Sequence, residues 1–91
     1  MSIIAISLRV TGKVQGVGFR NGLFEQARQF ELCGYVRNRA DGSVEAQAVG
    51  PKERVQALIL WCEKGTPAAQ VASVLVERLE DVPIYTTFLR L

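Results

Sequence analysis

The sequence predicts an α+β fold in which an antiparallel sheet is covered on one face by two helices. Three observations lead to this prediction. Apolar residues alternate between residues 4 and 10, recur at helical spacing after residue 20, and alternate again on both sides of Asp41 and Gly42. A period of two is typical of half-buried strands, whereas a spacing of three and four is typical of amphipathic helices. The resulting order is βαββαβ with a short strand after it.

The first strand and the first helix follow from these spacings. A strand with one buried face is expected over residues 4–10, because apolar side chains occupy every second position: Ile4, Ile6, Leu8 and Val10. A helix is expected over residues 21–32, because Leu23, Ala27 and Phe30 recur at helical spacing. Phe24 lies beside this apolar set. Gly34 is expected to end this helix as a left-handed cap.

A hairpin and a second helix come next. Strands are expected over residues 35–40 and 44–49, since Asp41 and Gly42 between them are typical of a two-residue hairpin turn. Gly50 and Pro51 start the second helix, because proline suits a first helical turn. Residues 65–67, G-T-P, end it. Its apolar stripe consists of Val55, Leu58, Ile59 and Cys62.

The last elements are a strand over residues 71–79 and a short strand over residues 85–91 at an edge of the sheet, separated by the breaker Pro83. Trp61 lies beside the centre of the apolar stripe, so we expect it to cover the edge of the core. The complete order is that of the ferredoxin-like βαββαβ sandwich. Many families share this arrangement, so the function has to be argued from a site.

Length and composition describe a globular protein. The 91 residues suffice for a single domain over residues 1–91, and 48% hydrophobic residues with a mean hydropathy of +0.14 exclude a disordered chain. The apolar runs are too short to span a bilayer, and no basic leader precedes the first strand, so no membrane contact and a cytoplasmic location are expected. The net charge is only +2, and lysine and arginine do not cluster, which argues against nucleic-acid binding.

The residue types also limit the chemistry. Histidine is absent, which excludes Ser–His and Cys–His nucleophile pairs and histidine-ligated metals. Cys33 and Cys62 are too far apart for a CxxC site, and we interpret them as small buried side chains. Whether they form a disulfide in an oxidising compartment stays open.

The segment over residues 10–20, V-T-G-K-V-Q-G-V-G-F-R, has the features of an anion-binding loop. Gly12, Gly16 and Gly18 allow positive φ and close approach of the backbone to a ligand. Successive N–H groups, the positive end of the following helix and the guanidinium of Arg20 could then converge on one tetrahedral anion, with phosphate as the expected ligand. The alternative interpretation is an ordinary turn followed by a solvated arginine.

A second motif identifies the family that the sequence resembles. Residues 14–20 read V-Q-G-V-G-F-R and residues 34–38 read G-Y-V-R-N. In this order and at this distance, the pair closely resembles acylphosphatases, in which a loop V-Q-G-V-x-F-R is followed, after one helix, by a strand G-W/Y-V-R/K-N. The resemblance runs the length of the chain. It implies the ferredoxin-like fold and acylphosphatase activity, EC 3.6.1.7.

The resemblance also implies the roles of individual residues. Asn38 orients the attacking water, for which an amide that both donates and accepts is suited. Arg20 binds the phosphoryl oxygens together with five backbone N–H groups, those of Gln15, Gly16, Val17, Gly18 and Phe19. The leaving carboxylate is stable as an anion near neutral pH, so no general acid is needed. We therefore expect no metal, no cofactor and no covalent intermediate.

The implied substrate is an acyl phosphate, with inorganic phosphate as product and competitive inhibitor, and a monomer is expected. The acyl group stays open, because the loop recognises only the phosphoryl end. Acetyl, carbamoyl and glyceroyl phosphates all fit. Two alternatives are a non-catalytic acylphosphatase-like module and an RNA-binding ferredoxin-like module. RNA binding is disfavoured because Phe19 precedes a helix instead of lying on a central strand.

Three residues depart from the usual family pattern. Tyr35 replaces a common tryptophan, and Asn21 stands where an aromatic residue is frequent. Gly22 lies in the first turn of the helix, where it should cost about 1 kcal/mol relative to alanine. None of these removes a proposed catalytic group. Two neighbours of Asn38, Arg37 and Arg39, are expected to be solvated, and Lys13 is expected to be solvated and to add attraction for anions.

Overall fold

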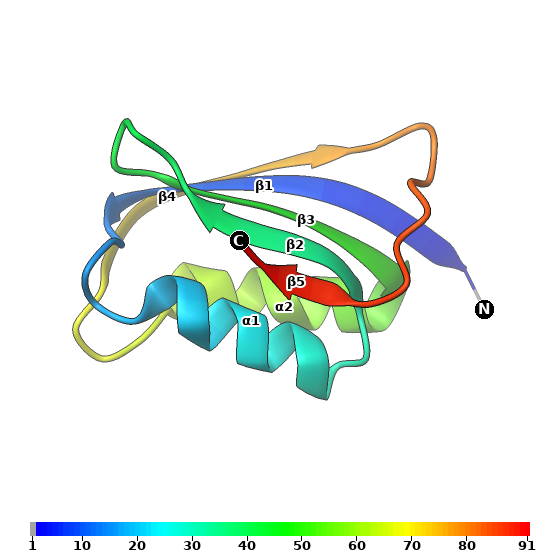
Figure 1. Cartoon of the computed structure of the whole chain (residues 1–91), viewed down its shortest axis with the longest axis horizontal. Coiled ribbons are helices and arrows are strands. Elements are labelled where there is room, and N and C mark those ends of the chain that lie inside the picture. The colour runs from blue at the N-terminus through cyan, green and yellow to red at the C-terminus, as the bar shows by residue number, and fades with distance from the viewer. Residues whose placement is uncertain (1) are drawn as a thin grey trace.

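The computed structural model describes residues 2–91, within which two helices pack on one face of a five-stranded sheet (Figure 1). The strands lie in the order β4-β1-β3-β2-β5. This arrangement confirms the predicted α+β, ferredoxin-like fold class with a short edge strand. In chain order the elements are β1 (Ile3–Lys13), α1 (Phe19–Gln29), β2 (Cys33–Asn38), β3 (Val44–Pro51), α2 (Lys52–Lys64), β4 (Gln70–Arg78) and β5 (Phe88–Arg90).

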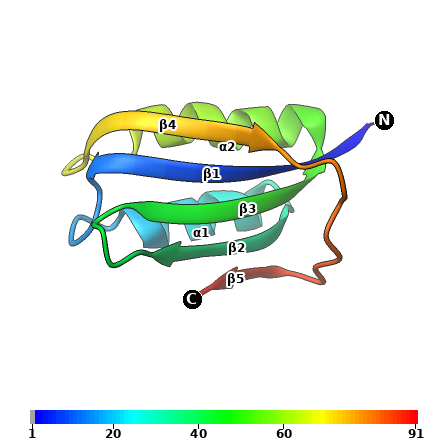
Figure 2. The same cartoon turned by 90° about the horizontal axis from the view of Figure 1, so that it is seen from above.

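The sheet is antiparallel across four strands and parallel at one edge. β1 pairs antiparallel with both β3 and β4, and β2 pairs antiparallel with β3. β5 instead pairs parallel with β2, Gly34 facing Phe88 in the register. Figure 2 shows why: after β4 the chain passes around the end of the sheet to its opposite edge, so that β5 runs in the direction of β2. The sheet is therefore mixed, whereas the sequence predicted antiparallel pairing.

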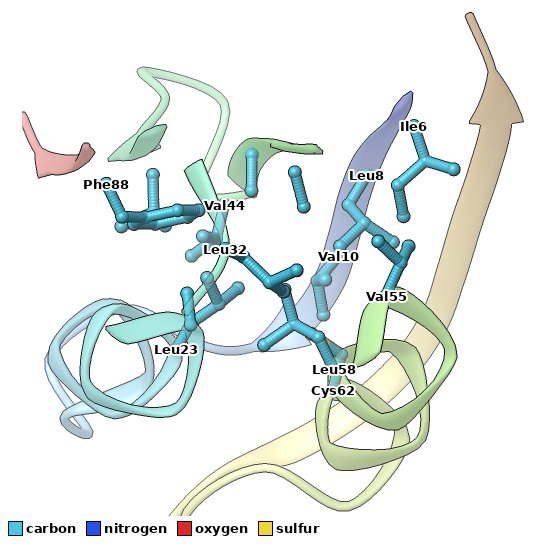
Figure 3. Close-up of a cluster of buried hydrophobic side chains, with 14 of the residues drawn as sticks. Ile6, Leu8, Val10, Leu23, Leu32, Val44, Val55, Leu58, Cys62 and Phe88 are labelled. Atoms are coloured by element: carbon cyan, nitrogen blue, oxygen red, sulfur yellow. The ribbon is translucent and has the colours of Figure 1, made fainter. Parts of the chain in front are cut away.

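The core lies between the sheet and the two helices. The alternating residues of β1 are buried as predicted, and Leu23 of α1 and Leu58 of α2 are completely inaccessible to solvent. Figure 3 shows these side chains in the space between the two helices and the sheet, with Leu58 toward Val10 of β1 and Leu23 toward Leu32. Trp61 covers the edge of this core as expected, with its ring centroid 5.3 Å from that of Phe19. Burial of apolar surface on one face of each element thus fixes α1, and with it the loop that precedes it.

Helix α1 ends differently from the prediction. It spans Phe19–Gln29, and Gly34 is not its cap but a residue of β2 with φ of +138°. The left-handed residue is Glu31, with φ of +56°. The N–H groups of Glu31 and Leu32 donate to the carbonyl oxygens of Arg28 and Ala27, which is the Schellman pattern. The helix therefore ends at Gln29, five residues before the glycine, and its left-handed residue is a glutamate, for which this conformation is strained.

The β2–β3 hairpin is confirmed, but its turn has three residues. Within the turn only Gly42 has positive φ, +93°, whereas a two-residue type I′ turn needs positive φ at both central positions. The N–H of Arg39 donates to the carbonyl oxygen of Ser43 at 2.9 Å, which closes a loop over residues 40–42. The Asp41 carboxylate accepts from both the N–H and the hydroxyl of Ser43. This local bonding favours the longer turn.

The remaining expectations were close to the structure. Pro51 is the N-cap of α2 and not its first helical residue. The apolar stripe of α2 faces the core, and Gly65 ends the helix. The terminal strand is shorter than predicted and begins at Phe88. Tyr85 lies before it and bonds through its hydroxyl to Gln47. Cys33 and Cys62 both carry free thiols, and Cys62 is buried. Within residues 2–91 no helix is long and apolar enough to cross a membrane.

The left-handed Glu31 provides a test of the helix ending. We expect Glu31→Gly to be more stable than Glu31→Ala by about 0.5–1 kcal/mol, because relief of left-handed strain exceeds the extra chain entropy that glycine loses. Both changes remove the ion pair between Glu31 and Arg54, so it cancels in the comparison. Urea unfolding measures the difference.

The control is the same pair of substitutions at Glu25, which is exposed inside α1. There the order should reverse, since glycine is the poorer helix former. If alanine were the more stable residue at both positions, Glu31 would not carry the strain.

Candidate active site

The turn from β1 into α1 bends through two left-handed glycines. The backbone φ is +75° at Gly16 and +78° at Gly18. Alternation of left-handed and ordinary residues turns neighbouring N–H groups toward one side, which creates an anion-binding concavity. Among the residues that the structure describes, no acceptor is found for the backbone N–H groups of residues 15–21. The loop and the first turn of α1 therefore present a row of free donors at the positive end of the helix.

Arg20 brings a positive charge to this row of donors. It lies in the first turn of α1 and is half-buried. Its Nη1 donates to the carbonyl oxygen of Leu91 at 3.2 Å, which fixes the guanidinium against the end of β5. Its Nε is buried and has no hydrogen-bond partner within residues 2–91. A buried donor without an acceptor is costly, so the geometry favours an anion at this position.

Asn38 completes a pocket of about 170 Å³ at this place. It is the last residue of β2, is exposed, and lines the same pocket as the first residues of α1. The lining consists of Val14, Gly16, Gly18, Phe19, Arg20, Asn21 and Asn38. Arg20 is the ionisable residue among these seven, so the pocket is electropositive. The fold thus brings together the glycine loop, Arg20 and Asn38.

Two of the predicted loop residues do not line the pocket with their side chains. The Gln15 side chain turns away and donates through Nε2 to the carbonyl oxygens of Arg39, at 2.7 Å, and Ser43, at 2.9 Å. It thereby ties the loop to the β2–β3 hairpin that carries Asn38. Val17 packs against the core and accepts a hydrogen bond through its carbonyl oxygen. Lys13 is exposed at the end of β1 and lies outside the lining.

Comparison with known proteins identifies the family of this chain. The sequence model described as Acylphosphatase matches residues 6–89. The chain belongs to the acylphosphatase family. The acylphosphatase of Rhizorhabdus wittichii is 55% identical over 81% of this chain and 75% of that protein. The predicted family and its enzyme class are thereby confirmed.

Solved acylphosphatase structures share the complete fold. The acylphosphatase from Bacillus subtilis matches with a TM-score of 0.93 at 32% sequence identity, over 97% of this chain and 98% of that one. The acylphosphatase from Coxiella burnetii matches with a TM-score of 0.92 at 35% identity, over 97% and 92% of the two chains. The likeness therefore includes the loop, α1 and the end of β2.

A charge cluster lies beside Asn38 on the sheet face that the helices leave open. Glu45 accepts hydrogen bonds from the Tyr35 hydroxyl, at 2.5 Å, and from Arg37 and Arg39. The Tyr35 hydrogen bond, helped by the two guanidinium groups, outweighs burial and lowers the pKa of Glu45 to about 2. Burial and the same carboxylate raise the pKa of Tyr35 to about 12.

This cluster corrects the expectation that Arg37 and Arg39 are simply solvated. Arg37 and Glu45 are cross-strand partners in the register, which accounts for their ion pair. The larger hollow above the cluster, about 340 Å³, includes Tyr35 and Glu45, whose polar groups are already paired with each other. Tyr35 is the one residue of the two family motifs in its lining, whereas Arg20 and Asn38 line the smaller pocket.

Sequence reasoning missed the contribution of β5 to the pocket. Arg90 donates to the Asn21 side-chain oxygen at 2.8 Å, and Leu91 supplies the acceptor for Arg20. These pairs are 69 and 71 residues apart, so no local pattern could have indicated them. Asn21 was noted as a departure from the family pattern, and the structure makes it part of the pocket wall. Among the described residues, no group of three or more acidic or cysteine side chains could hold a metal ion.

The depressed pKa of Glu45 predicts how stability depends on pH. In the folded protein this pKa is about 2, below the ordinary 4.5. The carboxylate thus adds stability above about pH 4.5, and this stability is lost as the pH falls toward 2. We expect Glu45→Gln to lower the free energy of unfolding by about 1–2 kcal/mol at neutral pH, after allowance for solvent screening of Arg37. The acid limb, which is the fall of this free energy between about pH 4.5 and 2, should become less steep in the variant.

Urea unfolding between pH 2 and 7 provides the measurement. Glu25→Gln, which removes the same charge from the exposed side of α1, is the control. An acid limb of Glu45→Gln that runs parallel to that of the parent protein would contradict the role of Glu45.

Proposed function

We propose that this chain hydrolyses the carboxyl–phosphate anhydride of acyl phosphates to a carboxylate and inorganic phosphate, the reaction of EC 3.6.1.7. The proposal rests on one observation above all: the glycine loop, the unpaired Nε of Arg20 and Asn38 line the same small pocket. Membership of the acylphosphatase family supports it independently. The direct test is hydrolysis of benzoyl phosphate by the purified protein in the presence of a chelator.

The phosphoryl group binds at the loop. Arg20 and the backbone N–H groups of residues 15–19 hold its nonbridging oxygens and offset their negative charge. These donors are already oriented before substrate arrives, because the left-handed glycines fix the loop and β5 fixes the guanidinium. Preorganised donors do not have to reorient during the reaction, which is why such an arrangement lowers the barrier. No covalent intermediate is required.

The attacking water binds to Asn38. Its amide accepts one hydrogen bond from the water and donates another, so it orients the water without removing a proton. Asn38 lines the same pocket as the glycine loop and Arg20, and in the proposed reaction its water attacks in line with the leaving oxygen. The proton passes to a phosphate oxygen, and the carboxylate leaves as an anion. The reaction therefore proceeds without a metal, a cofactor or a general acid.

The proposal also covers the product, the oligomeric state and the cellular location. Inorganic phosphate carries the oxygens that the loop holds, so it acts as a competitive inhibitor as well as the product. The protein acts as a monomer in the cytoplasm. Size-exclusion chromatography of the active protein checks the first of these statements, and localisation of the tagged full-length protein checks the second.

The RNA-binding alternative gains no support from the open face of the sheet. Its two tyrosines, Tyr35 and Tyr85, use their hydroxyls to bond Glu45 and Gln47. A non-catalytic module stays testable, since it would bind phosphate without hydrolysing benzoyl phosphate.

Arg20→Ala tests the phosphoryl contact. The change removes the cation of the pocket, so we expect kcat/KM for benzoyl phosphate to fall at least a hundredfold, about 3 kcal/mol or more, and phosphate to bind much more weakly. Arg28→Ala is the matched control, because Arg28 lies on the exposed side of the same helix. Near-normal turnover by folded Arg20→Ala would refute the assignment.

Asn38→Ala separates water placement from phosphate binding. Phosphate should bind within about twofold of the parent affinity, because the loop and Arg20 are intact, whereas kcat should fall about a hundredfold. Calorimetric titration with phosphate and benzoyl phosphate kinetics on the same samples give both quantities. Loss of phosphate binding equal to that in Arg20→Ala would make Asn38 a structural support of the loop.

A further inference from the structure

A long-range hydrogen bond joins the glycine loop to the segment between α2 and β4. The Thr66 hydroxyl donates to the carbonyl oxygen of Val17 at 2.8 Å, and the two residues are 49 positions apart. Figures 1 and 2 both show these two connections side by side at the same end of the molecule. Val17 precedes Gly18, so the bond acts on the peptide group between the two residues.

The direction of this peptide group determines where the Gly18 N–H points. No cis peptide bond occurs within residues 2–91. In a trans peptide the C=O and the N–H point in opposite directions. Thr66 lines a separate hollow with Trp61 and Gly65, whereas Gly18 lines the pocket of Arg20 and Asn38. Holding the Val17 carbonyl toward Thr66 therefore turns the Gly18 N–H away from Thr66.

Thr66 is itself held in place. Its carbonyl oxygen accepts from the N–H of Ala69 at 3.0 Å, and the preceding Gly65 donates to Trp61 at 2.7 Å. Its methyl group lies against Gly22 of α1, where a β carbon would be 3.1 Å from Thr66 Cγ2 and 2.8 Å from the Trp61 ring. The close approach explains why glycine occupies the first turn of α1 despite its cost to the helix.

We propose that Thr66 is a positioning residue of the active site, which aims the Gly18 N–H at the phosphoryl group. This inference rests on the proposed function, because it assigns a task to a donor of the same anion site. Thr66 does not touch substrate. It acts by occupying the Val17 carbonyl, so the Val17–Gly18 peptide group cannot turn over and present an oxygen to the anion. A donor replaced by a carbonyl oxygen would repel phosphate.

Two substitutions isolate the hydroxyl of Thr66. Thr66→Val keeps the branched shape and removes the donor, whereas Thr66→Ser keeps the donor and removes the methyl group. In the valine variant we expect the phosphate dissociation constant to rise, and kcat/KM for benzoyl phosphate to fall, by about fivefold to tenfold. Both should stay within about twofold of the parent in the serine variant. Thr11→Val, which removes a hydroxyl bonded to Ser73 between β1 and β4, is the control and should change neither quantity.

A spectroscopic readout distinguishes this role from simple support of the fold. In ¹⁵N-labelled parent protein, the amide signal of Gly18 should shift on addition of inorganic phosphate, and in Thr66→Val this shift should largely disappear while the protein stays folded. If Thr66→Val is too unstable to study, Thr66→Ala replaces it in the same measurement.

The outcomes are separable from those of the proposed function. If the parent protein neither binds phosphate nor hydrolyses benzoyl phosphate, the function itself is wrong, and the role of Thr66 falls with it. If the parent does both and Thr66→Val matches it in phosphate affinity and in the Gly18 shift, only the positioning role is overturned. Equal loss in the serine and valine variants would also overturn it, because the hydroxyl would then not be the cause.

Discussion

The turn through Gly16 and Gly18 is the constraint on which the rest of the site depends. A backbone bent in this way leaves a row of N–H groups without acceptors, which no isolated peptide would keep aligned. Other parts of the fold hold it: Gln15 bonds the hairpin, Thr66 bonds Val17, and the core buries α1 behind it. The layered fold therefore holds the unpaired backbone N–H groups of the glycine loop in one orientation.

The charged side chains of the open sheet face and of the pocket are paired differently. Glu45 lies in β3, next to the residue that pairs with Asn38, and on the open face of the sheet it accepts a hydrogen bond from Tyr35 and pairs with two arginines. Arg20, in contrast, keeps its Nε unpaired in the pocket. Arg37 and Arg39 thus complete an ion-pair cluster, whereas Arg20 keeps a donor available for an anion.

The sequence predicted the parts of this arrangement that are encoded locally. Alternation in β1 and the stripe of α2 identified the core, because burial imposes a period on neighbouring residues. The end of α1 was predicted wrongly because glycine is the usual left-handed cap, and here tertiary packing places Glu31 in that conformation. The motifs indicated Arg20 and Asn38, whereas the contacts that fix the pocket, such as Leu91 to Arg20, join residues too distant in sequence to leave a pattern.

The short strand β5 has a consequence for the dynamics of the pocket. It pairs with β2 over three residues only, Gly34 to Val36, at an edge of the sheet. Edge segments with few hydrogen bonds open at a lower free energy than the core. Because Asn21 is bonded to Arg90 of this strand and Arg20 to Leu91 directly after it, local opening of the edge releases one wall of the pocket while the remaining strands stay paired. Amide hydrogen exchange of residues 88–90 would therefore report the lifetime of the assembled site, and this lifetime can be much shorter than that of the fold.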